Sequence, residues 1–294
     1  MIFSNAWHPD RGYYNEWWYF TLLCGSGDII AGNFKIQNKR PKVWLFLKTK
    51  DGKSQYLEQE YKFKDFSAAK DFCRVKIGDN KIEQKGNDFS LRVKLKNFDL
   101  SVAFQPAVDW KNNVLKKDIS RKQKVFWIVP CLRGSFAGTL NDGKQVKKIK
   151  GIVYHDHVWH NITFTSAILG FKEWLWGICY IKNGSILFGN IRFAGKNFSI
   201  LSVEKDGVVR STNKEINPEH IIWVRLKNSL KVRLNKKNLL TAVIQKKEKI
   251  AFAADNRFLS FFTKKIFHIA QAHCTIDCLA GKSRGRGYME TLSK

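Results

Sequence analysis

Short apolar runs separated by turn signals follow one another along most of the chain. Several of them alternate apolar and polar residues, as Leu91 to Leu95 does, and a period of two is that of a β-strand with one buried face. Others are rich in β-branched and aromatic residues, which favour strands. The pattern predicts strands over residues 17–23, 43–47, 91–95, 100–104, 125–129, 152–159, 175–181, 186–193, 221–226, 230–234 and 239–244.

Glycine, asparagine and aspartate gather between these runs and predict hairpin connections. Such signals occupy residues 25–28, 51–52, 78–80, 141–143, 182–184 and 206–207. The pattern also allows a helix over residues 65–72, which could equally be a loop, and another over residues 258–272. Many short strands with closely spaced turns predict an all-β sandwich or barrel architecture. At 294 residues, two such units are favoured over one.

A faint internal repeat supports this duplication. Residues 148–156 and 284–290 each contain a basic residue, a glycine and then a tyrosine two positions before an acid. Two halves that end in the same strand pattern predict a first domain over residues 1–162 and a second over residues 163–294.

The segment from Gly151 to His160 holds the densest candidate chemistry of the chain. If it is a strand, Tyr154 and Asp156 share one face, together with Val158 and His160. His155, His157 and Trp159 share the other face. A tyrosine and a carboxylate two residues apart could handle a proton, whereas the histidines could hold the strand in place or bind a metal. His160 lies on the wrong face to complete a metal site with the other two histidines, so no metal is predicted.

The formal charge of +27 is spread evenly, with about +14 in residues 1–150 and about +13 in residues 151–294. An even spread does not indicate a dedicated nucleic-acid arm, and lysine-rich composition accounts for it more simply. It would allow peripheral contact with anionic membranes. No specific nucleic-acid partner is expected, and the oligomeric state stays open.

The cysteines and the chain start suggest a cytoplasmic protein. The six cysteines are scattered, which favours free thiols. His273, Cys274 and Cys278 could be read as half a zinc site but lack a second pair at ligand spacing. No apolar run of about 18 residues predicts a transmembrane helix, and no signal peptide is visible.

Three motifs together carry a resemblance to a known family. They are Glu16-Trp17-Trp18-Tyr19-Phe20, the segment from Gly151 to Trp159 that contains Tyr154-His155-Asp156-His157, and Gly285-x-Gly287-Tyr288-x-Glu290. In this order they resemble the carotenoid 1,2-hydratase (hydroxyneurosporene synthase) and AttH-like group. The resemblance implies two tandem lipocalin-like β-barrel domains that handle large apolar molecules. Terpene cyclases, Diels-Alderase-type cyclases and lipid-binding proteins belong to the group. His160 stands where glycine is usual.

The resemblance places the functional pair on Tyr154 and Asp156. We expect Asp156 to protonate an alkene, with Tyr154 and His157 as its catalytic partners. The resulting carbocation needs aromatic faces around it. Side chains expected to line the apolar pocket, near the domain interface, are Trp17, Trp18, Trp127, His155, Trp159 and Trp176. Glu16 and Glu290 are at least as readily explained as structural residues.

The leading hypothesis is therefore a cofactor-independent enzyme of the lyase or isomerase type. It would cyclise or hydrate a hydrophobic isoprenoid or polyene. A pericyclic, Diels-Alder-type cyclase and a non-catalytic lipid carrier remain as alternatives. The sequence lacks a glycine-rich phosphate loop and a Gly-x-Ser-x-Gly elbow, so nucleotide-dependent and hydrolase classes have no support.

Overall fold

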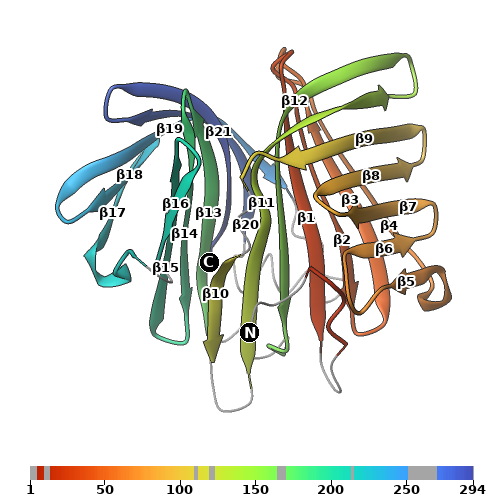
Figure 1. Ribbon diagram of the computed structural model, residues 1–294, viewed down its shortest axis with the longest axis horizontal. Coiled ribbons are helices and arrows are strands. Elements are labelled where there is room, and N and C mark those ends of the chain that lie inside the picture. The colour runs from red at the N-terminus through yellow and green to blue at the C-terminus, as the bar shows by residue number, and fades with distance from the viewer. Residues whose placement is uncertain are drawn as a thin grey trace. The chain divides into compact units, whose positions relative to one another are not determined.

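The computed structural model describes residues 5–9, 14–108, 112–118, 123–163, 170–212, 215–250 and 270–293. The chain divides into two compact units, Met1–Ile162 and Thr163–Lys294. Each unit contains one antiparallel sheet and, among its described residues, one single-turn 3-10 helix (Figure 1). The expectation of an all-β protein is confirmed.

Unit 1 is a sheet in which the strand order is β4-β3-β2-β1-β12-β11-β9-β8-β7-β6-β5, with β10 paired to β11. The strands are β1 (Asn15–Cys24), β2 (Ile29–Gln37), β3 (Arg40–Lys48), β4 (Ser54–Glu60), β5 (Phe66–Ala68), β6 (Arg74–Ile77), β7 (Asn80–Lys85), β8 (Asp88–Leu95), β9 (Phe98–Pro106), β10 (Asn112–Asp118), β11 (Lys124–Asn141) and β12 (Val146–His160). A 3-10 turn, η1 (Phe63–Asp65), precedes β5.

Unit 2 has the strand order β16-β15-β14-β13-β21-β20-β19-β18-β17. Its strands are β13 (Phe171–Ile181), β14 (Gly184–Phe193), β15 (Lys196–Lys205), β16 (Val208–Ser211), β17 (Ile221–Leu226), β18 (Ser229–Leu234), β19 (Lys237–Ile250), β20 (Ala270–Ala280) and β21 (Ser283–Ser293). A 3-10 turn, η2 (Pro218–His220), precedes β17.

Strand β12 differs from the outer strands in its burial. The side chains of β8 alternate strictly between exposed and buried, as expected for a strand with one solvated face. In β12, by contrast, every residue from Val153 to Trp159 is buried. β12 pairs with β1 without interruption from Gly151 to His160, and with β11 on its other side, where the register shifts between Ile128 and Gly134. Both faces of β12 are therefore dry, and its polar side chains must find partners.

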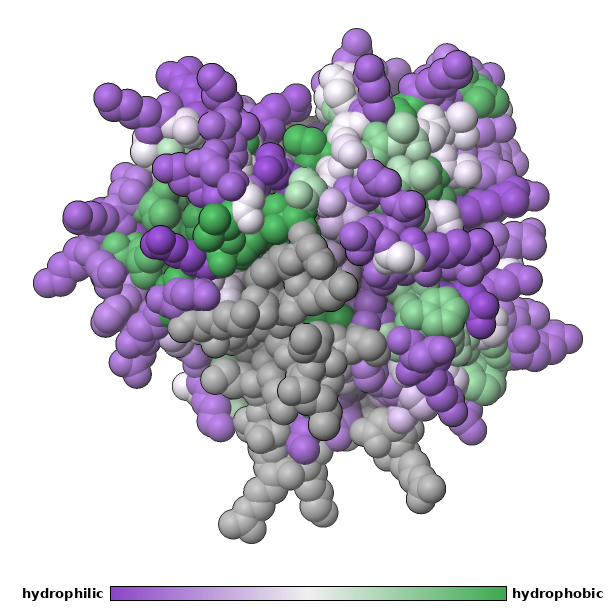
Figure 2. Space-filling model, in the orientation of Figure 1, coloured by the Kyte–Doolittle hydropathy of each residue, from purple (hydrophilic) through white to green (hydrophobic). Residues whose placement is uncertain are grey.

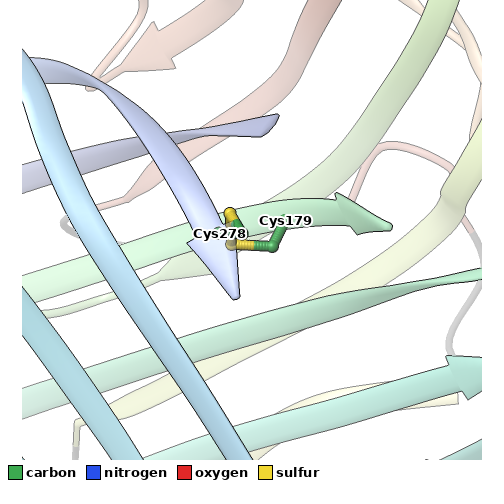
Figure 3. The surroundings of a disulfide bond; sticks show 2 residues. All are labelled: Cys179 and Cys278. Carbon is green, nitrogen blue, oxygen red and sulfur yellow. A yellow bond between two sulfur atoms is a disulfide. The ribbon is translucent and has the colours of Figure 1, made fainter. Parts of the chain in front are cut away.

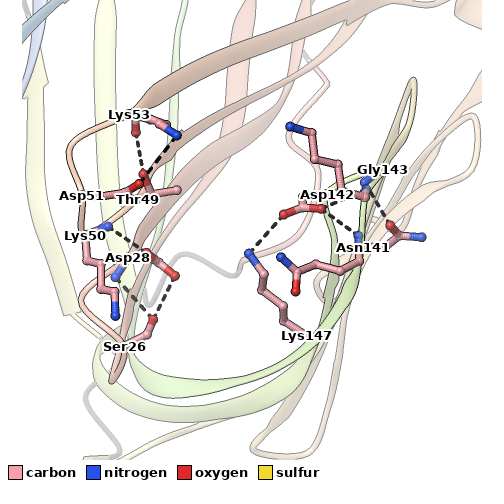
Figure 4. Close-up of polar contacts among 12 residues, drawn as sticks. Ser26, Asp28, Thr49, Lys50, Asp51, Lys53, Asn141, Asp142, Gly143 and Lys147 are labelled. Atoms are coloured by element: carbon pink, nitrogen blue, oxygen red, sulfur yellow. Dashed lines mark hydrogen bonds and ion pairs between the residues drawn. The ribbon is translucent and has the colours of Figure 1, made fainter.

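The turns are held by short polar side chains, as the sequence predicts. Asp28 accepts hydrogen bonds from Ser26 Oγ at 2.9 Å and from the backbone N–H of Lys50 at 2.8 Å, so it links two neighbouring hairpin ends (Figure 4). Asp142 accepts from the backbone N–H groups of Lys144 and Gln145 and from Lys147 Nζ, at 3.0–3.1 Å. These hydrogen bonds lower the pKa of Asp142. All six predicted turns lie between consecutive strands.

The predicted helices do not appear where they can be checked. Residues 65–72 form the end of η1, the short strand β5 and a loop, so the helical alternative is wrong and local tertiary pairing decides the conformation. Of the second segment, residues 258–269 lie outside the described part. Its last three residues, Ala270–Ala272, begin strand β20 and pair with β21.

The expectation of free thiols is wrong for two of the cysteines. Cys179 on β13 and Cys278 on β20 form a disulfide (Figure 3), whereas Cys24, Cys73, Cys131 and Cys274 are buried and belong to no disulfide. Cys278 therefore cannot serve the half zinc site that the sequence allows. The two bonded Cα atoms lie 6.2 Å apart, although β21 runs between their strands in the sheet order. Two strand spacings in a flat sheet measure about 9.6 Å, so the sheet curls tightly at this point.

Glycines on β21 permit this tight curl. Gly287 pairs with Cys179, and Gly285 pairs with Cys278. A Cβ atom at Gly285 would clash with the carbonyl oxygen of Tyr180, and one at Gly287 would clash with that of Ile178. The Gly285-x-Gly287 motif is thus needed for β21 to pack closely against β13, next to the disulfide.

Hydrophilic side chains predominate on the face of the molecule drawn in Figure 2, and hydrophobic ones appear in patches between them. Within the described ranges, no helix is both long and apolar enough to cross a membrane.

The disulfide closes a loop of 99 residues within unit 2. Because a cross-link over such a loop restricts the unfolded chain, reduction should lower the free energy of unfolding of unit 2 by about 2–5 kcal/mol. Urea unfolding with and without reductant measures the effect. A Cys179→Ala, Cys278→Ala double variant is the control and should not respond to reductant. Equal sensitivity of the wild type and the double variant would contradict the assignment.

Candidate functional site

The two faces of β12 carry two separate groups of polar residues. The inner face of unit 1 is defined by its hydrophobic core, which includes Trp18, Phe20, Val153 and Trp159. In the register of β1 with β12, Trp18 pairs with His157 and Phe20 pairs with His155, so both histidines point to this core. Tyr154 and Asp156 lie on the opposite, outer face.

On the outer face, Tyr154 and Asp156 form a buried acid pair. The Tyr154 hydroxyl donates to Asp156 Oδ2 at 2.8 Å, and the two residues are 0% and 3% exposed. Tyr19 lies opposite Asp156 on β1, and its hydroxyl accepts a hydrogen bond from Thr21 Oγ1 at 3.0 Å. The rings of Tyr19 and Tyr154 meet edge to face with centroids 6.4 Å apart. The pair is therefore both dry and fixed in orientation.

Two tryptophans extend the outer face beyond the acid pair. Val158 pairs with Trp17 on β1 and with Trp127 on β11, so the three side chains form a row across adjacent strands. Trp127 is 1% exposed, and Trp17 is half-buried. Because Val158 follows Asp156 on the same face, this row presents aromatic surface next to the acid pair.

On the inner face, Glu16, His8 and His157 form a second cluster. Glu16 Oε1 lies 2.7 Å from His157 Nε2 and 3.2 Å from His8 Nδ1, and it also accepts from the backbone N–H of His8 at 3.1 Å. Glu16 and His157 are fully buried. The His157 ring stacks on Trp18, and the His8 ring stacks on Trp159. We call these three residues, with Asn5 and His155, the inner polar cluster.

His155 is a structural member of this cluster. Its Nδ1 donates to the carbonyl oxygen of Tyr19 at 2.7 Å, and its Nε2 accepts from Asn5 Nδ2 at 2.9 Å. Both ring nitrogens of the neutral form are satisfied, so the side chain needs no ligand. The backbone carbonyl oxygen of Asn5 in turn accepts a hydrogen bond from Trp18 Nε1 at 3.1 Å. The segment of residues 5–9 is thereby tied to β1 and β12.

Burial shifts the pKa values of the inner polar cluster in the directions that favour the uncharged forms. Loss of hydration raises the pKa of Glu16 well above its usual value, against the smaller lowering by the His8 backbone N–H. Burial also lowers the pKa of His157 well below its usual value and the pKa values of His8 and His155 to about 4. Glu16 and His157 are thus both shifted toward their uncharged forms, and the contact between them is a hydrogen bond.

His160 is the last residue of β12, and both of its ring nitrogens have polar neighbours. Its Nδ1 accepts from the backbone N–H of Ile162 at 3.1 Å, and its Nε2 faces the Asn15 side-chain amide at 3.3 Å. Burial lowers its pKa to about 3. Trp17 packs edge-on against its ring. The His160 imidazole thus ties the end of β12 to its neighbours through contacts that a glycine could not make.

Unit 2 contains a second tyrosine–acid pair. The Tyr288 hydroxyl donates to Glu290 Oε1 at 2.9 Å, and Trp176 Nε1 donates to Glu290 Oε2 at 3.2 Å. His273 Nδ1 contacts the Tyr288 hydroxyl and lies 3.2 Å from Glu290 Oε1. Desolvation lowers the pKa of His273, and the charge of Glu290 partly offsets this shift.

The registers make the two pairs equivalent. In unit 1, Asp156 pairs with Tyr19 of the strand that opens the unit, and in unit 2 Glu290 pairs with Trp176 of the equivalent strand β13. Three residues before each tyrosine stands a glycine, Gly151 or Gly285, at which a Cβ would clash with the carbonyl oxygen of the neighbouring strand. The repeat noticed in the sequence is thus a structural one.

The same register relates two buried glutamates. Glu16 lies opposite the residue five positions after Tyr154, and Glu173 lies opposite the residue five positions after Tyr288. Each has basic partners: histidines around Glu16, and Arg225 with Arg192 around Glu173. Strands β1 and β13 therefore each carry a buried carboxyl group near their start, but the residues around the two carboxyl groups differ.

The predicted site residues fall into three groups that do not share one surface. Tyr154, Asp156, Trp17 and Trp127 share the outer face of unit 1. Trp18, His155, His157 and Trp159 point to its core, so strand alternation separates His157 from Asp156. Trp176 belongs to unit 2 and contacts Glu290.

Sequence reasoning missed His8 and the carboxyl role of Glu16 in the inner polar cluster. Contacts that span 141 and 8 positions join Glu16 to His157 and to His8. In the sequence, Glu16 and His157 belong to two separate motifs at opposite ends of the first domain. Only the pairing of β1 with β12 shows that the two motifs lie side by side.

Comparisons with known proteins identify the fold. No family model and no curated protein sequence matches the chain. Among solved structures, a protein from Nitrosomonas europaea provisionally assigned as AttH has a TM-score of 0.71 and 14% identity, over 96% of this chain and 92% of its own. CghA, crystallised with Sch210972, has a TM-score of 0.65 and 9% identity, over 96% and 88%. Kievitone hydratase from Nectria haematococca has a TM-score of 0.61 and 8% identity, over 95% and 89%.

At these identities the likeness concerns the fold, and it extends over nearly the whole chain. The predicted tandem of two lipocalin-like β domains is confirmed. The AttH-like group that the motifs resemble is also the group whose fold the chain shares.

The hydrogen bond of the outer acid pair can be measured by a double-mutant cycle. Tyr154→Phe should lower the free energy of unfolding of unit 1 by about 1.5–3 kcal/mol, because it removes a donor to a buried carboxyl group. Combined with Asp156→Ala, which removes the acceptor, the two losses should fall short of additivity. Tyr19→Phe, which removes a hydroxyl-to-hydroxyl bond, is the control and should cost about 0.5–1.5 kcal/mol. Strict additivity in urea unfolding would show that the pair is not coupled.

Proposed function

We propose that the protein is an enzyme of the hydratase or cyclase kind that protonates an alkene of a hydrophobic isoprenoid or polyene. The observation that carries the proposal is the buried Tyr154–Asp156 hydrogen bond on a face that also presents Trp17 and Trp127. The fold supports the general kind of activity, since kievitone hydratase and CghA share it. A shared fold does not select the reaction, so the proposal depends on the site.

In the proposed reaction, Asp156 begins as the neutral acid. Exclusion of water favours the uncharged form of a carboxyl group, and the Asp156 side chain is almost fully buried. Tyr154 donates to Oδ2 and fixes the plane of the carboxyl group, so Oδ1 would carry the proton. The alkene π pair takes this proton and forms a C–H bond. The adjacent carbon becomes a cation, and Asp156 becomes a carboxylate.

Two outcomes then regenerate the acid. Attack by a second alkene closes a ring, and loss of a proton to the Asp156 carboxylate gives an isomer of the substrate. Addition of water gives an alcohol after the oxygen returns its extra proton to the carboxylate. In either case the tryptophan faces stabilise the cation through their quadrupoles, each by on the order of 0.5–2 kcal/mol.

The proposed reaction needs no resident cofactor, because the proton that Asp156 gives to the alkene is returned to Asp156 in each cycle. Tyr154 acts as a positioning residue for Asp156. His157 is left out of the proposed chemistry, because it points to the core of unit 1 and contacts Glu16.

The test uses D₂O and a panel of acyclic isoprenoids and prenylated aromatic compounds. Alkene protonation should place solvent deuterium on carbon in the product, detected by mass spectrometry. Asp156→Asn should lower turnover by about 10²- to 10⁴-fold, the usual contribution of a general acid, while ligand binding measured by tryptophan fluorescence is retained. Asp277→Asn, the same change at an exposed position of unit 2, should leave turnover unchanged.

Other outcomes identify the competing functions. A product without deuterium, formed equally well by Asp156→Asn, would indicate a pericyclic cyclase. Saturable binding across the panel with no product would indicate a carrier. Either result would overturn the proposal.

A further inference from the structure

The mechanism above leaves the inner polar cluster unused, although it concentrates ligand-type atoms in the core of unit 1. One ligand atom each from His8, Glu16 and His157 lies within 4.8 Å of the other two. We propose that these three residues bind a divalent transition-metal ion of the Zn²⁺ type. The proposal concerns the face of β12 opposite the acid pair and does not depend on the function proposed for that pair.

The donor set suits such an ion. Two imidazole nitrogens and one carboxylate oxygen form a His₂Glu set, which binds Zn²⁺ at sites where a fourth position stays open. Neighbouring ligand atoms around a tetrahedral Zn²⁺ lie about 3.3 Å apart, as follows from metal–ligand distances near 2.1 Å. Here Glu16 Oε1 lies 3.2 Å from His8 Nδ1 and 2.7 Å from His157 Nε2. The first distance fits, the second must open by about 0.6 Å, and the third, between the ligand atoms of His8 and His157, is within 4.8 Å.

The strands place two of the ligands without help from the ion. Glu16 and Trp18 share the inner face of β1, and His157 and Trp159 share the inner face of the adjoining β12. Glu16 therefore reaches His157 diagonally across the pair of strands. His157 Nδ1 is buried without a hydrogen-bond partner in the described part of the chain, so stacking on Trp18, at 4.6 Å between centroids, sets the plane of this ring.

The third ligand comes from outside the sheet and gives access to the site. His8 lies on the segment of residues 5–9, and its side chain is 24% exposed, whereas those of Glu16 and His157 are 0% exposed. Its ring lies flat on Trp159, with centroids 3.9 Å apart and planes 5° apart. An ion can thus reach the cluster from the His8 side. Once bound, it would fasten this segment to β1 and β12.

The experiment starts from full-length protein that carries no histidine tag and has been freed of metal by a chelator. Calorimetric titration with Zn²⁺ should show one tight site. Co²⁺ should give the visible bands of a four- or five-coordinate ion with nitrogen and oxygen ligands. His8→Ala should weaken Zn²⁺ binding by at least about 100-fold, more than the loss of an outer hydrogen-bond partner usually costs. Zn²⁺ should also raise the melting temperature of the wild type but not that of His8→Ala.

The matched control is His220→Ala, which removes an exposed histidine in unit 2 and should leave Zn²⁺ affinity unchanged. Circular dichroism checks that His8→Ala is folded, and His8→Gln serves as a second variant. Equal Zn²⁺ affinity in the wild type and a folded His8 variant would overturn the proposal, as would the absence of tight binding in the wild type. Thiolate-to-cobalt charge-transfer bands would also overturn it, because they would place the ion on one of the buried cysteines outside the disulfide.

Discussion

Burial on both faces of β12 is the constraint on which the rest of unit 1 depends. A strand in the middle of a sheet has its backbone satisfied by its neighbours, but each polar side chain between Val153 and Trp159 must be satisfied separately. The inner face does this with histidines, Glu16 and the segment of residues 5–9. The outer face does it with a tyrosine–acid hydrogen bond. One strand therefore separates two groups of buried polar side chains.

Duplication explains why the same arrangement recurs in unit 2, and divergence explains where it differs. The glycine, the tyrosine and the acid keep their register, because the strand must approach its neighbour closely and its tyrosine donates to the carboxyl group two positions later. The partners have changed, with Trp176 and His273 around Glu290 where unit 1 has Tyr19 opposite Asp156. Unit 2 also adds a disulfide across the curl of its sheet.

Periodicity and turn chemistry predicted much of the fold, because both are local. The strand at residues 152–159 and the division of its side chains between two faces followed from alternation alone. Contacts that join distant residues could not be predicted in this way. The Cys179–Cys278 disulfide, the contact of His157 with Glu16 and the pairing of β20 depend on which strands become neighbours. The sequence therefore indicated the acid pair but assigned Trp18, His155 and Trp159 to its pocket, although they point to the core.

The central claim is that Asp156 on the outer face of β12 meets a developing cation. The most direct measurement is the affinity for an isoprenoid amine, whose ammonium group mimics that cation, in the wild type and in Asp156→Asn. A charge-assisted contact with a buried carboxylate predicts about tenfold or greater loss of affinity in the variant, and a neutral hydrocarbon of equal length should bind both proteins equally. Equal affinity of the amine for both proteins would contradict the account.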